Sequence, residues 1–180
     1  ATTAANSQVL YGNKGDDQLR GGTGNDVLYG GQDADILQGN AGNDELWGGV
    51  GADTIGLGTT GTDEGTDAGA DTLAAGDGND SIGGGAGNDI IIAGAGNDTI
   101  ENGAGADLVY GNTGDDLMSD ANNDDDDGAD TLYGGQGADT VLADDGNDIV
   151  YGNKGADSLA GEGGDDILYG GQDADRLDGG

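Results

Sequence analysis

Aliphatic residues recur at every ninth position over most of the chain, and a polar, glycine-rich stretch separates each one from the next. From Gly12 the chain follows a nonapeptide template, G-G-x-G-x-D-x-U-x, in which U is aliphatic. Side chains in x-U-x alternate between two faces, as in a short strand with the aliphatic residue inward. A period of nine fits neither an α-helix nor a heptad repeat, so each nonapeptide predicts a turn followed by a short strand. The eighth-position residues, the aliphatic column, are Leu19, Leu28, Leu37, Leu46, Ile55, Leu73, Ile82, Ile91, Ile100, Val109, Met118, Leu132, Val141, Val150, Leu159, Leu168 and Leu177.

An aspartate occupies the sixth position of the template with the same regularity. A chain with patternless disorder has no reason to keep an acidic and an aliphatic column in phase over this length. We therefore predict that both columns belong to one ordered architecture. The sixth-position residues, the aspartate column, are Asp17, Asp26, Asp35, Asp44, Asp53, Asp71, Asp80, Asp89, Asp98, Asp107, Asp116, Asp130, Asp139, Asp148, Asp157, Asp166 and Asp175.

Glycines at the first, second and fourth positions predict a tight turn, often with positive φ. The residues that replace glycine there are frequently Asn or Asp, which tolerate left-handed backbone better than other side chains. Two such turn-and-strand units complete one coil, so the sequence predicts an all-β fold: a right-handed parallel β-roll with two nonapeptides per coil. The replacements are Asn13, Asn40, Asn112 and Asn153 at the second position, and Asp33 and Asp173 at the fourth.

Two segments interrupt the period. In residues 57–65, LGTTGTDEG, Thr62 replaces the aspartate and Glu64 stands where the aliphatic residue should be. This segment is either a degenerate turn or an extruded loop, and we favour the loop because burying an unpaired glutamate is costly. Residues 120–124, DANND, insert five residues. The acidic run 124–127 is interpreted as a solvated loop, with an additional cation site as the alternative.

These interruptions divide the chain. The predicted segments are a leading strand or partial repeat at 1–11, repeats at 12–56, a degenerate repeat or loop at 57–65, repeats at 66–119, an acidic insertion at 120–124, and repeats at 125–180.

Aromatic residues gather at the outward-facing ninth position. Because 18 residues make one predicted coil, residues at this spacing should stack as ladders on one flank. Such a ladder either stabilises its own sheet through cross-strand pairs or offers a surface for self-association or for a neighbouring domain. The two predicted ladders are Tyr11, Tyr29 and Trp47, and Tyr133, Tyr151 and Tyr169.

Composition narrows the possible partners. The 180 residues include 43 glycines and no Pro, Cys or His, and 4 basic residues against 37 acidic ones give a net charge of −33. This charge repels nucleic acid and anionic membranes, while carboxylates attract hard divalent cations. No apolar stretch is long enough for a membrane-spanning helix. Composition alone would be typical of a disordered chain, so order must come from the periodic pattern.

The nonapeptide resembles the repeat-in-toxin (RTX) calcium-binding family, and the resemblance covers residues 12–178. In that family the G-G-x-G-x-D loops stack along each side of a β-roll, with calcium between successive loops, bound by sixth-position carboxylates and loop carbonyls. The resemblance therefore implies that the whole aspartate column binds metal, with multiple Ca²⁺ ions, roughly one per repeat loop. One aliphatic residue per repeat makes a narrow core among dense negative charge, so we expect folding to require calcium.

Catalysis is not expected from these residues. The chain has no His or Cys, and its serines lie outside any G-x-S-x-G motif. We expect instead a calcium-dependent extracellular structural rod at a bacterial cell surface, in a surface layer, fibril or adhesin. The resemblance is greatest to repeat-only surface proteins, including S-layer and oscillin-like fibril proteins.

Residues 150–180 also repeat residues 10–40, including Lys14 as Lys154, which predicts a piece of a longer repetitive protein. The alternative is a calcium-folding module that aids the secretion and stability of an enzyme or toxin exported by type I secretion.

Overall fold

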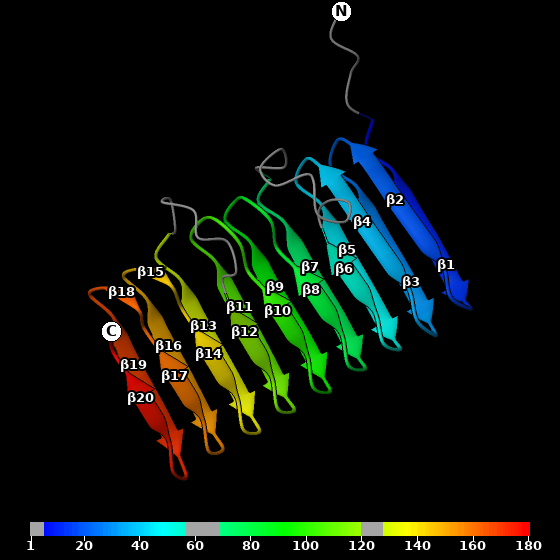
Figure 1. The fold of residues 1–180 in the computed structure, drawn as a ribbon. Coiled ribbons are helices and arrows are strands. Elements are labelled where there is room, and N and C mark those ends of the chain that lie inside the picture. Colours follow the sequence, from blue (N-terminus) through cyan, green and yellow to red (C-terminus); the bar gives the residue numbers. More distant parts are fainter. Residues whose placement is uncertain (1–5, 57–68, 120–127) are drawn as a thin grey trace, which may run out of the picture.

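The computed structural model describes residues 6–56, 69–119 and 128–180, and every regular element in these ranges is a β-strand. The interruptions predicted at 57–65 and 120–124 lie outside them. The strands wind into a parallel β-solenoid, the predicted β-roll, whose coils stack side by side along one axis (Figure 1). Within each coil a strand of one sheet is followed, after a tight turn, by a strand of the other.

Two nine-stranded parallel sheets form the walls of the roll. The first sheet, in spatial order, consists of β1 (Val9–Lys14), β3 (Val27–Gln32), β5 (Glu45–Val50), β7 (Thr72–Asp77), β9 (Ile90–Ala95), β11 (Leu108–Thr113), β13 (Thr131–Gln136), β16 (Ile149–Lys154) and β19 (Ile167–Gln172). The second consists of β2 (Gln18–Thr23), β4 (Ile36–Ala41), β6 (Thr54–Gly56), β8 (Ser81–Gly83), β10 (Thr99–Glu101), β12 (Leu117–Ser119), β14 (Thr140–Leu142), β17 (Ser158–Ala160) and β20 (Arg176–Asp178). A short pair, β15 (Asp145–Gly146) and β18 (Gly163–Gly164), joins two neighbouring turns.

Strand register shows how the coils are spaced. Leu10 pairs with Leu28, so successive coils are normally two nonapeptides apart. The pairs Leu46–Leu73 and Val109–Leu132 have larger spacings, with nine and five additional residues. In both places the strands on either side of the additional residues pair in parallel with unbroken alternation, so neither sheet gains a strand among the described residues.

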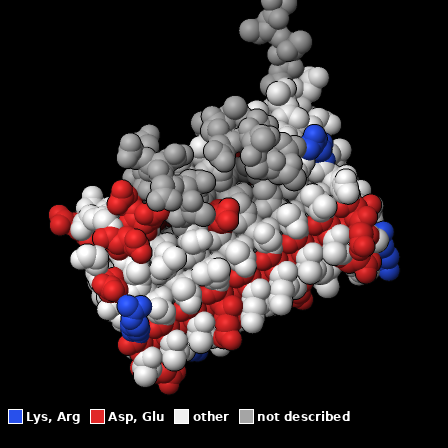
Figure 2. Space-filling model, viewed as in Figure 1, with Lys and Arg blue, Asp and Glu red and all other residues white. Residues whose placement is uncertain are grey.

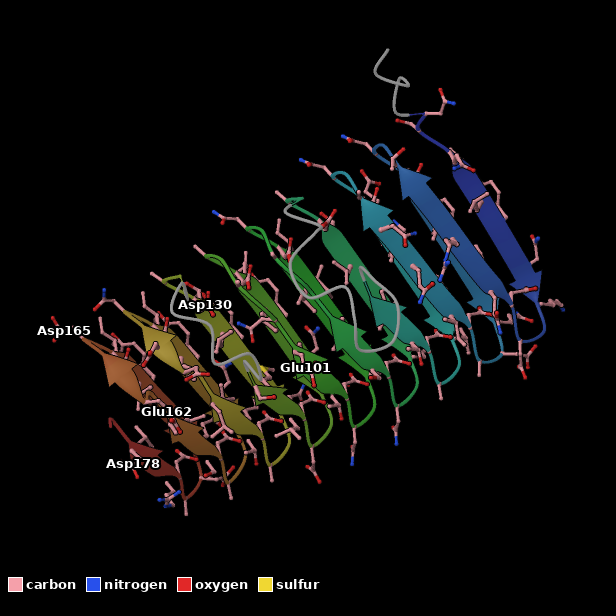
Figure 3. All side chains as sticks on the ribbon, turned by 45° about the horizontal axis from the view of Figure 1, so that its top comes forward. Glu101, Asp130, Glu162, Asp165 and Asp178 are labelled. Carbon is pink, nitrogen blue, oxygen red and sulfur yellow. The ribbon has the colours of Figure 1, made fainter. Side chains whose placement is uncertain are left out.

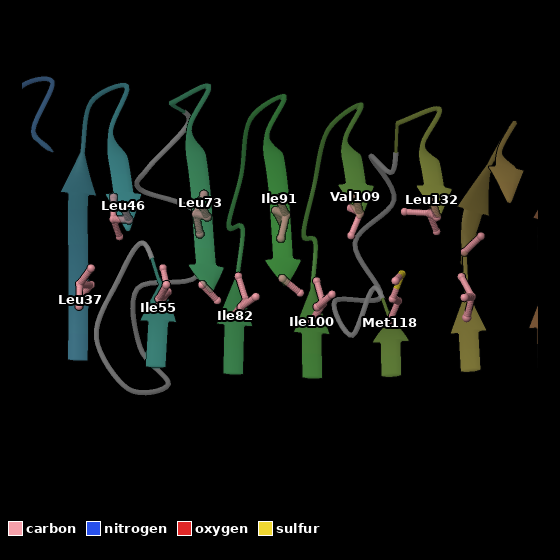
Figure 4. Packing of buried hydrophobic residues seen from close by; sticks show 14 of the residues in the cluster. Leu37, Leu46, Ile55, Leu73, Ile82, Ile91, Ile100, Val109, Met118 and Leu132 are labelled. Atoms are coloured by element: carbon pink, nitrogen blue, oxygen red, sulfur yellow. The ribbon is translucent and has the colours of Figure 1, made fainter. Parts of the chain in front are cut away.

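The aliphatic column fills the space between the two sheets (Figure 4). Its members from Leu19 to Leu159 are buried, and Leu168 is partly buried against them. Leu177 is 46% exposed, because its strand β20 is at the end of the second sheet and no further strand covers it. Ala75, a first-position residue, joins the core, as do its equivalents Ala93 and Ala143.

The predicted left-handed turn residues have positive φ. Asn13 has φ 80° and Asp33 has φ 78°, and all six predicted positions follow the same rule. Asp144 and Glu162, at the second position of their repeats, also have positive φ, which the sequence analysis did not predict. These turns reverse the chain between the two sheets within a few residues.

Both aromatic ladders form on the first sheet. Tyr11 stacks on Tyr29 with ring centroids 5.0 Å apart, and Tyr29 stacks on Trp47 at 6.4 Å. The second ladder is longer than predicted, because Tyr110 stacks on Tyr133 at 5.0 Å. Its other members, Tyr133, Tyr151 and Tyr169, stack at 4.7 and 4.9 Å.

Candidate metal centre

The turns bury the aspartate column. From Asp26 to Asp157 its members are only 1–3% exposed, although aspartate is normally a surface residue. They come from both kinds of turn, so they line both edges of the roll. Rows of acidic side chains run along the length of the molecule (Figure 2). Burying so many carboxylates requires partners that offset the loss of water.

From Asp26 to Asp175, Oδ1 of each column aspartate accepts a backbone N–H from the preceding coil. The backbone N–H of Asp17 donates to Oδ1 of Asp35 at 2.9 Å, and that of Asp35 donates to Oδ1 of Asp53 at 2.8 Å. The same bond forms where the coils are farther apart in sequence. The backbone N–H of Asp107 donates to Oδ1 of Asp130, and that of Asp116 donates to Oδ1 of Asp139. Each aspartate thus connects its own turn to a turn in the next coil.

In many of the described carboxylates the second oxygen, Oδ2, is buried without a donor. A buried acceptor without a donor loses its hydration and gains nothing in return, which is costly for a charged group. The chain offers hydrogen-bond donors to one side of the carboxylate only, and a metal ion is a suitable partner for the other. Among the described residues, Oδ2 has no hydrogen-bond partner in Asp17, Asp26, Asp35, Asp53, Asp80, Asp98, Asp107, Asp116, Asp139, Asp157 and Asp166.

First-position glycines leave a space toward which two oxygens point. A Cβ built on Gly12 would lie 2.6 Å from Oδ2 of Asp17 and 2.6 Å from the carbonyl oxygen of Gly30 in the next coil. At Gly30 the distances are 2.5 Å to Oδ2 of Asp35 and 2.7 Å to the carbonyl oxygen of Gly48. Here glycine is required for space and not for backbone conformation. A carboxylate oxygen without a donor, next to a carbonyl oxygen, suits a hard cation.

Burial also shifts the acid strength of the column. It raises the pKa of Asp80, Asp116 and Asp139 from an ordinary value of 3.8 to about 6, and that of Asp107 to about 8. In each case a backbone hydrogen bond lowers the pKa in part, while the charges of neighbouring aspartates raise it. Without metal these four carboxylates therefore resist ionisation, and a divalent cation would relieve both the burial cost and the repulsion.

Side chains alone do not make a metal cage. Within residues 6–56, 69–119 and 128–180, no group of three or more acidic, His or Cys side chains is placed to hold one ion. Calcium takes six to eight oxygens and accepts backbone carbonyls readily. Any site in these turns must therefore combine aspartate oxygens with loop carbonyls, and both kinds of oxygen are present at the glycine spaces.

Comparison with known families agrees with this donor set. A family model described as the RTX calcium-binding nonapeptide repeat matches nearly the whole chain, at residues 5–37, 29–63, 65–100, 83–118, 103–124, 124–159 and 151–180. The chain belongs to this family. RTX nonapeptides bind calcium, so the predictions of the family and of multiple Ca²⁺ ions are confirmed. No curated protein gives a significant match. In the part of this RTX chain that the structure describes, no helix could cross a membrane.

Asn102 is a site residue that the sequence analysis missed. Among the described repeats it is the only first-position residue that is neither Gly nor Ala, a signal visible in the sequence. It is 1% exposed, and its side-chain Nδ2 donates to Oδ2 of Asp130 at 2.7 Å. Figure 3 labels Asp130 and Glu101, the residue before Asn102.

Proposed function

We propose that this RTX chain is a calcium-dependent structural rod and part of a longer extracellular protein of a bacterial surface layer, fibril or adhesin. The observation that carries the proposal is the aspartate column, whose buried second oxygens face glycine carbonyls along the length of the roll. Filling these turns with Ca²⁺ would offset much of the charge of −33 and tie each coil to the next. A stiff, uniform rod is the mechanical result.

We further propose that the metal ligands are the sixth-position carboxylates, together with loop carbonyl oxygens. Many members of the aspartate column satisfy both structural requirements, since Oδ1 accepts from the neighbouring coil and Oδ2 has no donor, as in Asp35, Asp53 and Asp98. Asp35 illustrates the arrangement: its Oδ1 accepts from Asp17, and its Oδ2 lies at the space left by Gly30. Calcium supplies positive charge and coordination, and the chain supplies the preformed oxygens.

The residues support a structural role over a catalytic one. The RTX β-roll is a structural calcium-binding fold. The carboxylates with raised pKa lie in a periodic ladder and share one arrangement, unlike the single irregular site of an enzyme. We therefore propose that the roll binds calcium for stability and shape.

Calcium titration tests the proposed rod. We expect the metal-free chain to be an expanded coil by small-angle X-ray scattering and to lack β signal by far-UV circular dichroism. Calcium should convert it into an elongated β-rich particle, and EGTA should reverse the change. Magnesium at the same ionic strength is the control, because its smaller size and strict octahedral geometry suit these turns poorly. A compact β-rich particle at pH 8 in the absence of divalent ions would contradict the proposal.

A second candidate, a calcium-folding module of a secreted enzyme or toxin, is favoured by the charge density. A chain that stays unfolded at low calcium and folds at high calcium suits export in the unfolded state. Fusing the chain to a reporter enzyme discriminates between the two functions. A module should raise the calcium-dependent stability or secretion of its fusion partner, whereas a rod should form filaments or layers visible by electron microscopy.

A further inference from the structure

Among the described repeats, Asn102 is the only first-position residue with a polar side chain. It lies in the turn after β10, where the family pattern has glycine, and its side chain is fully enclosed. Asparagine is rarely buried unless its amide makes hydrogen bonds. What the two ends of this amide contact therefore decides its role.

The donor end of the amide is used. Nδ2 donates to Oδ2 of Asp130 at 2.7 Å, while Oδ1 of the same Asp130 accepts from the backbone N–H of Asp107 at 2.8 Å. Asn102 is thus tied to the carboxylate of the next coil, and Asp107 is the sixth-position residue of its own repeat.

The acceptor end has no donor. Within the described residues, neither Oδ1 of Asn102 nor Oδ2 of Asp107 has a hydrogen-bond partner, and both atoms are buried. Asp107 is only 3% exposed, and its Oδ1 already accepts from the backbone N–H of Asp89 at 2.7 Å. Two buried oxygen acceptors without a donor in one turn call for a cation more strongly than the single carboxylate oxygen of a glycine turn.

We propose that the side-chain oxygen of Asn102 is an additional calcium ligand in the turn of Asp107 and Asp130. The inference rests on the proposed calcium-dependent rod and adds to it one turn of distinct composition. An amide oxygen is a normal calcium ligand, and it adds coordination without adding charge. This turn would therefore bind its ion more tightly than the glycine turns and fill at lower calcium.

The substitution Asn102→Ala tests the proposal on the full chain. Alanine fits the first position, because Ala75, Ala93 and Ala143 occupy it elsewhere in the core. We expect the calcium affinity of one binding step to fall about 10-fold or more. Isothermal titration calorimetry with a competing chelator measures this affinity. Loss of outer-shell partners alone typically costs 10–100-fold in metal affinity. The other steps should be unchanged.

Two further variants make the outcome decisive. Asn102→Asp keeps a side-chain oxygen and should retain the tight step. If the only role of Asn102 were its hydrogen bond to Asp130, this variant would lose the tight step, because it has no amide N–H to donate. Asn97→Gly, at an exposed fifth position whose Oδ1 accepts from the backbone of Asp115 at 3.1 Å, is the matched control and should leave every binding step unchanged. Circular dichroism at saturating calcium verifies folding of each variant.

An Asn102→Ala isotherm identical to that of the native chain would overturn the inference while leaving the calcium-dependent rod intact. Tighter calcium binding by Asn102→Ala would overturn the inference too. The amide would then take the place of a cation in the native chain, and its oxygen would not be a calcium ligand. If the native chain bound no calcium, the proposed function itself would fail.

Discussion

The backbone N–H of Asp80 donates to the carboxylate of Asp98 at 2.8 Å, across the gap between two coils. Asp98 in turn donates its own N–H to Asp116 at 2.9 Å. In both Asp98 and Asp116, Oδ1 accepts from the preceding coil and Oδ2 is the oxygen that we propose as a metal ligand. Stability and calcium binding depend on the same side chain, and substitutions in the column should affect both.

Asp98→Asn should weaken calcium-induced folding. The amide keeps the size of the side chain but removes the charge that holds a cation, so we expect the calcium midpoint for folding to rise several-fold. Circular dichroism during calcium titration gives this midpoint. Glu101→Gln removes the same charge from an exposed position of the same repeat and should leave the midpoint almost unchanged. Equal shifts in the two variants would mean that net charge matters and the aspartate position does not.

Gly30→Ala should fill the space where two oxygens converge. The new methyl would lie 2.5 Å from Oδ2 of Asp35 and 2.7 Å from the carbonyl of Gly48, so one of them must move. We expect weaker calcium binding and a loss of about 1–3 kcal/mol in the free energy of unfolding measured at saturating calcium. Gly83→Ala, where an added Cβ meets nothing within 4 Å, is the control. Similar losses in both variants would show only a general cost of substituting glycine.

Acid should order the metal-free chain. Because burial raises the pKa of Asp80, Asp116 and Asp139 to about 6 and of Asp107 to about 8, the folded state binds protons more tightly than the unfolded chain. This contribution to stability is fully present below the ordinary value of 3.8 and is lost as pH rises through the folded values. Circular dichroism of the chelator-treated protein should therefore gain β signal on acidification, mainly between pH 8 and 4.

The same proton linkage predicts that calcium expels protons. Adding calcium in weak buffer to the metal-free chain after acid has ordered it should acidify the solution, because the protonated carboxylates must ionise to bind the metal. A metal-free chain that is more ordered at pH 8 than at pH 4, or calcium binding without proton release, would contradict the burial of these groups.

We expect the second aromatic ladder to mediate association. Tyr133, Tyr151 and Tyr169 stack in a continuous column on the outer face, and Tyr169 is 51% exposed. Replacing all three by Ser should leave calcium-induced folding intact and lower the sedimentation coefficient of calcium-loaded assemblies. The first ladder, replaced as Tyr11→Ser, Tyr29→Ser and Trp47→Ser, is the matched control. Unchanged sedimentation in the triple tyrosine variant would leave the ladder a role within its own sheet, worth about 0.5–1.5 kcal/mol per aromatic pair.

Features that repeat within one nonapeptide could be predicted from the sequence. The strand at x-U-x, the buried aliphatic column and the left-handed backbone at Asn13 and Asp33 all follow from local periodicity and from residue geometry. The family of the chain and its binding of calcium could be predicted from the same period, since sixth-position carboxylates recur in phase with the aliphatic column.

Contacts between coils depended on the tertiary structure. Tyr110 joins the second ladder because the spacing of the coils changes between β11 and β13, and Leu177 is exposed because no strand follows β20 in its sheet. Two further contacts also form only when one coil lies on the next. One is the backbone hydrogen bond to Oδ1 that leaves Oδ2 without a donor, and the other is the hydrogen bond from Asn102 to Asp130. A periodic sequence determines the shape of one coil, whereas irregular spacings and ends decide which side chains meet across coils.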